Sequence, residues 1–242
     1  MKICPCCHND ALESFDKVQH NNEIYLIKIC SICLAIINET AFYESASRPQ
    51  EIIQKAVHYE SAALTLEDLQ IEVESNVLNL NNLLKIVKYN SDKSIFCDFG
   101  AGRGCASIAA AGLFSSVYSI DFDINLILET LIKIKIDLKN ITICSSINEI
   151  KEKVNFFYAW HSLEHIPDPK SFYANLRSFL APAAILAIQV PLYRKEHVIN
   201  CHYVFYSEVS FRRLALLWNY EVIDVIHDIK SSFITLIAKN KL

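Results

Sequence analysis

Two pairs of cysteines stand near the start of this 242-residue chain, at positions 4 and 7 and at positions 30 and 33. Each Cys-x-x-Cys pair suits a tight turn that presents two thiolates to one tetrahedral ion. A segment rich in β-branched residues, 24–29, lies between the pairs and is expected to be a strand. We therefore predict a structural Zn²⁺ site formed by Cys4, Cys7, Cys30 and Cys33, with no coordination position left open for catalysis.

The gap of 22 residues between the two pairs is that of a zinc ribbon. Cys6 is expected to be a spectator, because the adjacent Cys7 completes the better pair. Two alternatives stay open: His8 in place of one thiolate, or four unrelated reduced cysteines. Leu34 stands where ribbons often have glycine. The odd total of nine cysteines argues against a disulfide framework. The others are expected to be small core residues: Cys97, Cys105, Cys144 and Cys201.

Three of the four glycines fall within the five residues Gly100-Ala101-Gly102-Arg103-Gly104. Glycine permits positive φ and lets a ligand approach the main chain closely. A strand expected over 94–99 precedes this loop, and an alanine-rich helix expected over 104–113 follows it. That context is typical of a nucleotide-type cofactor site at the carboxyl end of a sheet. The Gly-x-Gly-x-Gly spacing departs from the dinucleotide fingerprint, because position 105 is Cys.

An acid follows the glycine loop at the distance that a ribose-binding carboxylate requires. The next expected strand, 117–121, ends on Asp121, about 20 residues beyond the loop. A carboxylate there can accept hydrogen bonds from both ribose hydroxyls. Asp123 is the competing acid, but it is expected to cap the helix that begins near Ile124. A glycine turn without a ligand is the alternative, which the agreement of loop, strand and acid disfavours.

Residues 98–104 resemble the first motif of the class I methyltransferases that depend on S-adenosylmethionine (SAM), and Asp121 matches that family's ribose-binding acid. Residues 160–169 resemble the loop after the fourth strand in the branch that methylates small metabolites. Residues 202–207 resemble the stretch before that branch's last helix. The resemblance covers about residues 70–240 and implies a SAM cofactor and methyl transfer.

The resemblance also implies roles for individual residues. Asp98 would orient the glycine loop or meet the methionine amino group, Asp121 would hold the ribose, and Phe122 would lie along the adenine. The family often has an acid after its third strand, near the adenine amine, where this chain offers serines such as Ser146. The cofactor-binding residues expected on this basis are Asp98, Gly100, Ala101, Gly102, Asp121, Phe122, Ser146, Trp160 and His161.

Alternating strands and helices after residue 94 predict an α/β fold, a Rossmann-like and mostly parallel seven-stranded sheet. Its last two strands are expected to form an antiparallel hairpin, because only the polar link 228–231 joins them. The expected domains are a zinc-ribbon module at 1–40, a helical connector and cap at 41–92, and the SAM-binding domain at 93–242. The expected strands are 94–99, 117–121, 141–144, 153–160, 183–190, 221–226 and 232–238, and the expected helices are 48–60, 66–89, 104–113, 124–138, 170–180 and 207–218.

Charge and hydrophobicity disfavour some classes of function for this chain. The net charge is −4 and no run of Lys and Arg exceeds two residues, which weighs against a nucleic-acid partner. The sequence contains neither an apolar run long enough for a membrane span nor a signal-peptide pattern, so we expect a cytoplasmic protein. We predict methyl transfer from SAM to a small polar acceptor, such as a sugar or secondary metabolite. The alternatives are a ribosomal RNA base methyltransferase with an RNA-binding ribbon, and a non-catalytic SAM-binding protein.

Two histidines are the candidate catalytic residues. An acceptor that carries a proton needs a general base to remove it, and imidazole has the most suitable unperturbed pKa near neutrality. His165 and His202 both fall in loops expected at the mouth of the cofactor site. A structural role, such as hydrogen bonding within the loop or packing, is the alternative for each ring.

Overall fold

The computed structural model describes residues 3–20, 22–47, 64–136, 139–228 and 230–241. These residues form a seven-stranded sheet in the order β10-β11-β8-β7-β4-β5-β6 and a four-stranded sheet in the order β1-β2-β3-β9. The larger sheet is mostly parallel and ends in an antiparallel hairpin, so the predicted α/β fold class is confirmed. The helix expected over 48–60 lies outside the described residues.

The seven strands of the larger sheet match the seven strands expected from the sequence after residue 94. The strands of the larger sheet are β4 (Ile95–Phe99), β5 (Ser116–Ile120), β6 (Ile141–Cys144), β7 (Val154–Trp160), β8 (Leu180–Pro191), β10 (Tyr220–Asp228) and β11 (Phe233–Asn240). The strands of the smaller sheet are β1 (Leu12–His20), β2 (Glu23–Cys30), β3 (Ile36–Asn38) and β9 (Val204–Phe205). The α-helices are α1 (Glu39–Ser47), α3 (Leu66–Val87), α4 (Cys105–Ala111), α5 (Ile124–Ile134), α6 (Pro169–Leu176) and α7 (Glu208–Leu217).

The chain divides into two compact units that are not continuous in sequence. Unit 1 takes in 1–62, 161–177 and 189–238, and unit 2 takes in 63–160, 178–188 and 239–242. The sequence-based domain boundaries after residues 40 and 92 stay a prediction. None of the described helices combines the length and apolar character needed to span a membrane.

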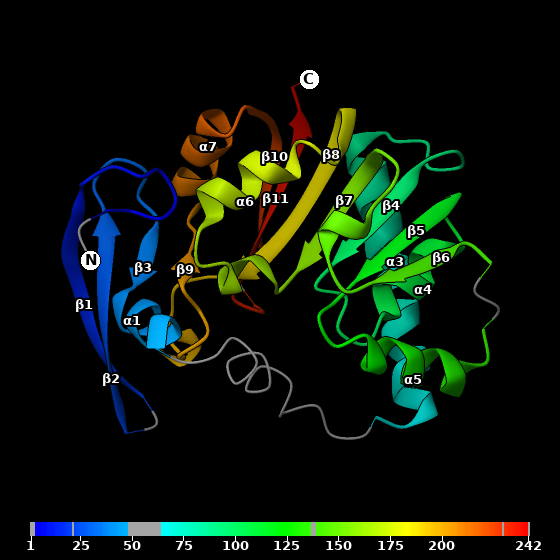
Figure 1. Cartoon of the computed structure of the whole chain (residues 1–242), viewed down its shortest axis with the longest axis horizontal. Helices are drawn as coiled ribbons and strands as arrows, with labels where there is room; N and C mark the ends of the chain where they lie inside the picture. Colours follow the sequence, from blue (N-terminus) through cyan, green and yellow to red (C-terminus); the bar gives the residue numbers. More distant parts are fainter. Residues whose placement is uncertain (1–2, 21, 48–63, 137–138, 229, 242) are drawn as a thin grey trace. The chain divides into compact units, whose positions relative to one another are not determined.

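In unit 2, parallel strands and three helices build the base of the glycine loop. β4 pairs in parallel with β5 and β7, and β5 pairs in parallel with β6. α4 packs on β4, β5 and β6, and α3 packs against α4 and α5 (Figure 1). A core of Ile108, Ile127 and Leu131 joins α4 to α5. The parallel pairing brings the carboxyl ends of these strands to one edge of the sheet.

Helix α3 begins and ends with well-formed caps. Thr65 and Asp68 form a reciprocal capping box at its start, and Lys88 ends it in the left-handed conformation. The sequence predicted this helix over 66–89, and its position is confirmed. Two of its amides, on Asn76 and Asn79, reach the hydroxyl of Tyr158 on β7. The helix is therefore attached to the sheet by polar as well as apolar contacts.

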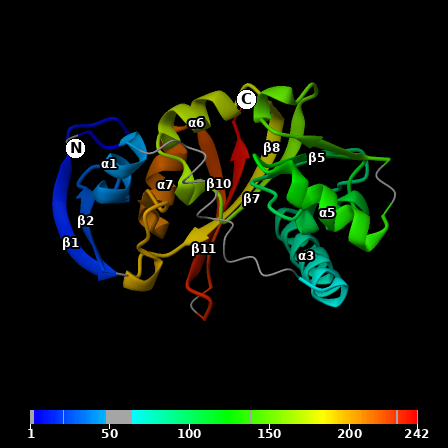
Figure 2. The same ribbon diagram turned by 60° about the horizontal axis from the view of Figure 1, so that its bottom comes forward.

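In unit 1, the N-terminal strands share a core with a segment far along the chain. β1 and β2 form an antiparallel hairpin (Figures 1 and 2). β3 pairs with β2, and β9 pairs with β3 through Ile36 and Phe205 (Figure 1). The buried side chains of this core are Val18, Tyr25, Ile27, Val198 and Phe205. The sequence predicted β2 but missed β1, whose side chains are mostly polar and exposed, so its pattern lacks a clear apolar face. The small sheet is therefore completed by residues from the loop after β8.

Candidate functional site

The glycine loop adopts the backbone that its composition predicted. Gly100, Gly102 and Gly104 have φ values of 73°, 54° and 75°, all in the left-handed region that favours glycine. A Cβ on Gly102 would meet no atom within 4 Å, whereas a Cβ on Gly104 would lie 3.0 Å from Cγ2 of Ile127. Gly102 therefore leaves open space beside the main chain, whereas Gly104 permits close packing of α4 on α5.

Asp121 fastens this loop to the end of β5. Its Oδ2 accepts a hydrogen bond from the Gly102 amide at 2.8 Å, and its Oδ1 accepts one from the Asp123 amide at 3.0 Å. The residue is buried. Asp123 caps α5 by accepting from the Asn125 amide, as the sequence predicted. The two acids of this turn thus have different tasks.

Asp98 lies beneath the loop in a buried polar cluster. The Ser107 hydroxyl lies 2.7 Å from Asp98 Oδ2 and 2.7 Å from the Ser119 hydroxyl. Burial raises the pKa of Asp98 to about 7, and the hydrogen bond from Ser107 only partly offsets this. The cluster ties β4 to both α4 and β5, which suits the expected role of Asp98 in orienting the loop.

The other expected cofactor residues of unit 2 follow neighbouring strands. Phe122 comes two residues after β5 ends and has an exposed fraction of 44%. Ser146 follows β6, where its hydroxyl accepts from the Asn148 amide. Trp160 ends β7 and stacks on Tyr158, with ring centroids 4.2 Å apart and an interplanar angle of 4°. Since these strands are parallel neighbours, the residues stand along one sheet edge with the glycine loop.

His161, the last expected cofactor residue, belongs to unit 1. It has a left-handed φ of 51°, which is uncommon for a residue with a side chain. Its amide donates to the Gln189 carbonyl at 2.9 Å, and its ring packs edge-on against Phe233 at 4.3 Å. Burial, together with the nearby His165 ring, lowers the pKa of His161, so the ring is neutral near pH 7.

The two candidate catalytic histidines lie together in unit 1. The His165 and His202 rings have centroids 4.9 Å apart. Nδ1 of His165 lies 2.8 Å from the Cys201 carbonyl oxygen, and Nδ1 of His202 lies 2.8 Å from the His197 carbonyl oxygen. A carbonyl oxygen only accepts, so each Nδ1 carries a proton and donates it. Burial lowers the pKa of His202 to about 3, which makes this ring neutral but weakly basic.

Glu164, which directly precedes His165 in the sequence, was not expected to be a site residue. Its side chain has an exposed fraction of 1%, and burial raises its pKa to about 8. Its main-chain oxygen accepts from the Tyr203 amide at 2.8 Å, which joins the turn at 163–165 to the segment before β9. Oε1 lies 3.8 Å from Nδ1 of His161. Alternation of buried and exposed residues does not apply in such a turn, so the sequence carried no signal of this burial.

The four cysteines of the predicted metal site converge and are buried. Sγ of Cys4 lies 3.6 Å from Sγ of Cys33, and Sγ of Cys7 lies 3.6 Å from Sγ of Cys30. All four sulfurs lie within 4.8 Å of one another, and none forms a disulfide. Zn–S bonds of about 2.3 Å would place tetrahedral sulfurs about 3.8 Å apart. The donor set and its spacing therefore fit Zn²⁺.

The turns that carry these cysteines have the backbone of metal-binding turns. His8 and Leu34, each directly after a cysteine pair, have φ values of 58° and 60°. Leu34 thus takes the left-handed conformation for which ribbons often use glycine. The His8 ring bonds Asp168 at 3.1 Å, and so it is engaged away from the four sulfurs. Cys6 is buried but lies outside the four-sulfur group.

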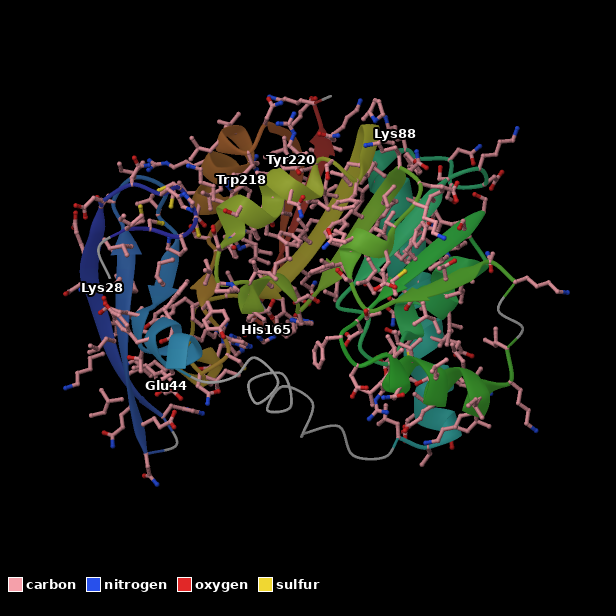
Figure 3. All side chains as sticks on the ribbon, in the orientation of Figure 1. Lys28, Glu44, Lys88, His165, Trp218 and Tyr220 are labelled. Carbon is pink, nitrogen blue, oxygen red and sulfur yellow. The ribbon has the colours of Figure 1, made fainter. Side chains whose placement is uncertain are left out.

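The first cysteine turn also contacts later parts of unit 1. The Trp218 indole Nε1 donates to the Cys6 carbonyl at 3.2 Å, and the Lys170 amide donates to the Pro5 carbonyl at 3.4 Å. Trp218 in turn stacks on Tyr173, with centroids 3.8 Å apart. Figure 3 labels Trp218 and shows yellow sulfur atoms gathered near the N-terminus. The turn is therefore attached to α6 and to the end of α7 rather than isolated.

A family model described as a methyltransferase domain matches residues 73–235. A solved SAM-dependent methyltransferase from Aquifex aeolicus is 20% identical, with a TM-score of 0.53, and the match covers 68% of this chain and 97% of that one. The magnesium protoporphyrin IX methyltransferase from Synechocystis PCC 6803, solved with bound SAH, is 14% identical, with a TM-score of 0.56 and coverage of 83% and 97%. An N-methyltransferase from Bradyrhizobium japonicum WM9 is 13% identical, with a TM-score of 0.54 and coverage of 67% and 94%. No curated protein sequence matches this chain. At these identities the structural likenesses concern the fold.

Proposed function

This chain belongs to the SAM-dependent methyltransferases, and we propose that it transfers a methyl group from SAM to a small polar metabolite. A sugar or a secondary metabolite is the kind of acceptor that we propose. The observation that carries the proposal is the glycine loop, whose open side at Gly102 stands next to the buried acid Asp121. SAM supplies an already activated methyl group, so the protein has to position an acceptor in line with it.

The residues of unit 2 divide the task of holding SAM. Gly100, Ala101 and Gly102 would admit the methionine portion to the main chain, and Asp121 would accept from the ribose hydroxyls. The Phe122 ring, which is exposed, would lie along the adenine. The Ser146 oxygen accepts a hydrogen bond from the Asn148 amide in a helix cap. Its hydroxyl would still be able to donate a hydrogen bond to adenine.

The acceptor would be met by residues of the segment 191–206. This segment carries aromatic, imidazole and basic groups, which suit a polar acceptor with an anionic part. Tyr193 is anchored on β1, where its hydroxyl donates to Asp16 at 2.8 Å and its ring packs edge-on against Phe15. His165 and His202 are the candidates for taking the acceptor's proton. Because Nδ1 of each ring donates to a main-chain carbonyl, Nε2 is the nitrogen that would take this proton.

The proposal includes one structural Zn²⁺ held by Cys4, Cys7, Cys30 and Cys33. Four thiolates fill the tetrahedral coordination sphere of Zn²⁺, so the ion would hold the two turns together and take no part in methyl transfer. The support is the close grouping of the four buried sulfurs and the left-handed backbone after each pair. The net charge of −4 favours a small-molecule acceptor over RNA for this chain.

A methyl-transfer screen tests the proposal directly. Purified protein would be incubated with SAM carrying a labelled methyl group and with three acceptor sets: nucleotide-linked sugars, phenols and ribosomal RNA. Label transfer to a small molecule is expected. Transfer to RNA alone would replace the proposed acceptor class by the RNA alternative. Binding of SAH without transfer to any acceptor would point to a non-catalytic SAM-binding protein.

A further inference from the structure

We propose that His165, Cys201 and His202 form a second metal site, separate from the four N-terminal cysteines, that binds Zn²⁺ or a similar first-row divalent ion. One ring nitrogen of each histidine and Sγ of Cys201 lie within 4.8 Å of one another. Zn–N bonds of about 2.1 Å and Zn–S bonds of about 2.3 Å need ligand atoms about 3.3–3.8 Å apart. A side-chain shift of about 1 Å would bring the three atoms to that spacing.

The two imidazoles are already oriented as metal-binding histidines are. A metal-bound histidine usually donates its other ring N–H to a carbonyl or carboxylate, which fixes the tautomer and the ring plane. Nδ1 of His165 lies 2.8 Å from the Cys201 carbonyl oxygen, and Nδ1 of His202 lies 2.8 Å from the His197 carbonyl oxygen. Each ring would then offer its other nitrogen, Nε2, to an ion.

The two chain segments that supply these ligands are tied to each other. The Tyr203 amide donates to the Glu164 carbonyl at 2.8 Å, and the His202 amide donates to the Ile199 carbonyl at 3.3 Å. Asn38, at the end of β3, adds a side-chain bond to the same Ile199 carbonyl at 2.9 Å. These contacts hold the segment 199–203 against the turn at 163–165. The site is thus preorganised by main-chain bonds rather than left to mobile side chains.

The surroundings provide the negative charge that a buried dication needs. Cys201 is buried and unpaired, and it would bind as a thiolate. The Glu164 carboxyl is also buried, and its Oε2 has no hydrogen-bond partner among the described residues. A buried carboxyl oxygen without a partner calls for a compensating group. A bound divalent ion would supply positive charge here, and the Cys201 thiolate would offset part of it.

Three protein ligands distinguish this site from the four-cysteine site. A closed set of four thiolates is structural, whereas three ligands leave a position for an exogenous oxygen. If the proposed function holds, that position suits the acceptor hydroxyl, whose pKa the ion would lower. The hydroxyl would release its proton to solvent, which would leave its oxygen as the nucleophile for the methyl group. In this arrangement the imidazoles act as ligands, not as proton acceptors.

Metal stoichiometry tests the site without any acceptor. Full-length protein would be produced with added zinc, purified without chelator and assayed by mass spectrometry for zinc per chain. Two equivalents are expected for the wild type, and one for Cys201→Ser and for His202→Ala. Cys144→Ser is the matched control, because it removes a buried thiol outside both clusters, and it should keep two equivalents. A Cys201→Ser protein that keeps the wild-type zinc content would overturn the proposal.

Cobalt substitution gives a second readout on the wild-type protein, so the result does not depend on whether a variant folds. Wild-type protein loaded with Co²⁺ should show two classes of visible bands, one of a four-thiolate site and one of a site with one thiolate and two imidazoles. Cys4→Ser should remove the first class and leave the second. Bands of the four-thiolate class alone would count against the second site. Because neither readout requires turnover, an inactive enzyme with two ions would refute the proposed function and leave this site standing.

Discussion

Oδ2 of Asp121 accepts a hydrogen bond from the main-chain amide of Gly102 at 2.8 Å, so the ribose-binding candidate also fixes the glycine loop. This single contact joins the two sequence features on which the cofactor assignment depends. A change at Asp121 should therefore act on SAM in two ways, through the lost acceptor and through the loosened loop.

Asp121→Ala is expected to weaken SAH binding by about 1.5–3 kcal/mol, because a charged acceptor loses its hydroxyl partners. Isothermal calorimetry with SAH measures this directly. Asp123→Ala is the matched control, since it removes an acid of the same turn whose contact is a helix cap. Equal affinity of Asp121→Ala and wild type would mean that the ribose is held elsewhere.

Gly104→Ala is expected to lower the free energy of unfolding by about 1–3 kcal/mol, the usual cost of overpacking. The new Cβ would lie 3.0 Å from Ile127, and the residue would keep a φ of 75° that alanine disfavours. Gly112→Ala is the control, because that position has a right-handed φ of −83° and its nearest contact would be 3.8 Å away. Urea denaturation of both variants would show whether only the first is destabilising.

Asp98 should give the protein a pH-dependent stability. Its pKa is about 7 in the folded protein, against about 3.9 in an unfolded chain. Between these values the folded state holds a proton that the unfolded chain has released, so the free energy of unfolding should fall as pH rises from about 4 to about 7. Each pKa unit corresponds to about 1.4 kcal/mol.

The variant Asp98→Asn removes this titration, so its stability should fall less steeply over the same pH range. Thermal denaturation at several pH values would measure the difference. Asp121 is the charged neighbour that also raises the pKa of Asp98, and it stays in place in this variant. The exposed Asp92→Asn is a control that should keep the wild-type slope. Parallel slopes for Asp98→Asn and wild type would contradict the assignment.

Zinc removal should loosen more than the N-terminal turns. Val18, Tyr25 and Ile27 share one core with Val198 and Phe205, so loss of the ion should raise hydrogen exchange in 3–38 and also in 191–206. Cys30→Ser, followed by exchange mass spectrometry, tests this. SAH affinity should stay near the wild-type value, because the residues expected to hold SAM in the glycine loop belong to the other unit. Faster exchange confined to 3–38 would show that the shared core does not transmit the loss.

His165→Ala and His202→Ala are each expected to lower turnover by about 10²-fold while SAH affinity changes little. A proton acceptor and a metal ligand would both give this result, and zinc content distinguishes them. His227→Ala is the control, since that ring bonds Glu208 on the surface and has no place in the proposed chemistry. Single-turnover rates at wild-type level in both variants would remove these histidines from the mechanism.

By itself, the sequence determined the features that depend on local backbone demands. Three clustered glycines required positive φ between a strand and a helix, and the structure has it at all three. The strand and helix order followed from the hydrophobic pattern, because each element buries one face. The spacing of the cysteine pairs was likewise enough to bring four sulfurs together.

Only the tertiary structure decided which distant segments share a site. β9 pairs with β3 across more than 160 residues of chain. Both strands are too short for their hydrophobic pattern to predict which strand each one pairs with. Cys201 is a second example. From the sequence we interpreted it as a small core residue, but in the structure its Sγ lies close to the rings of His165 and His202. The His165 ring donates a hydrogen bond to a carbonyl 36 residues away, and such a contact exists only once both segments are packed.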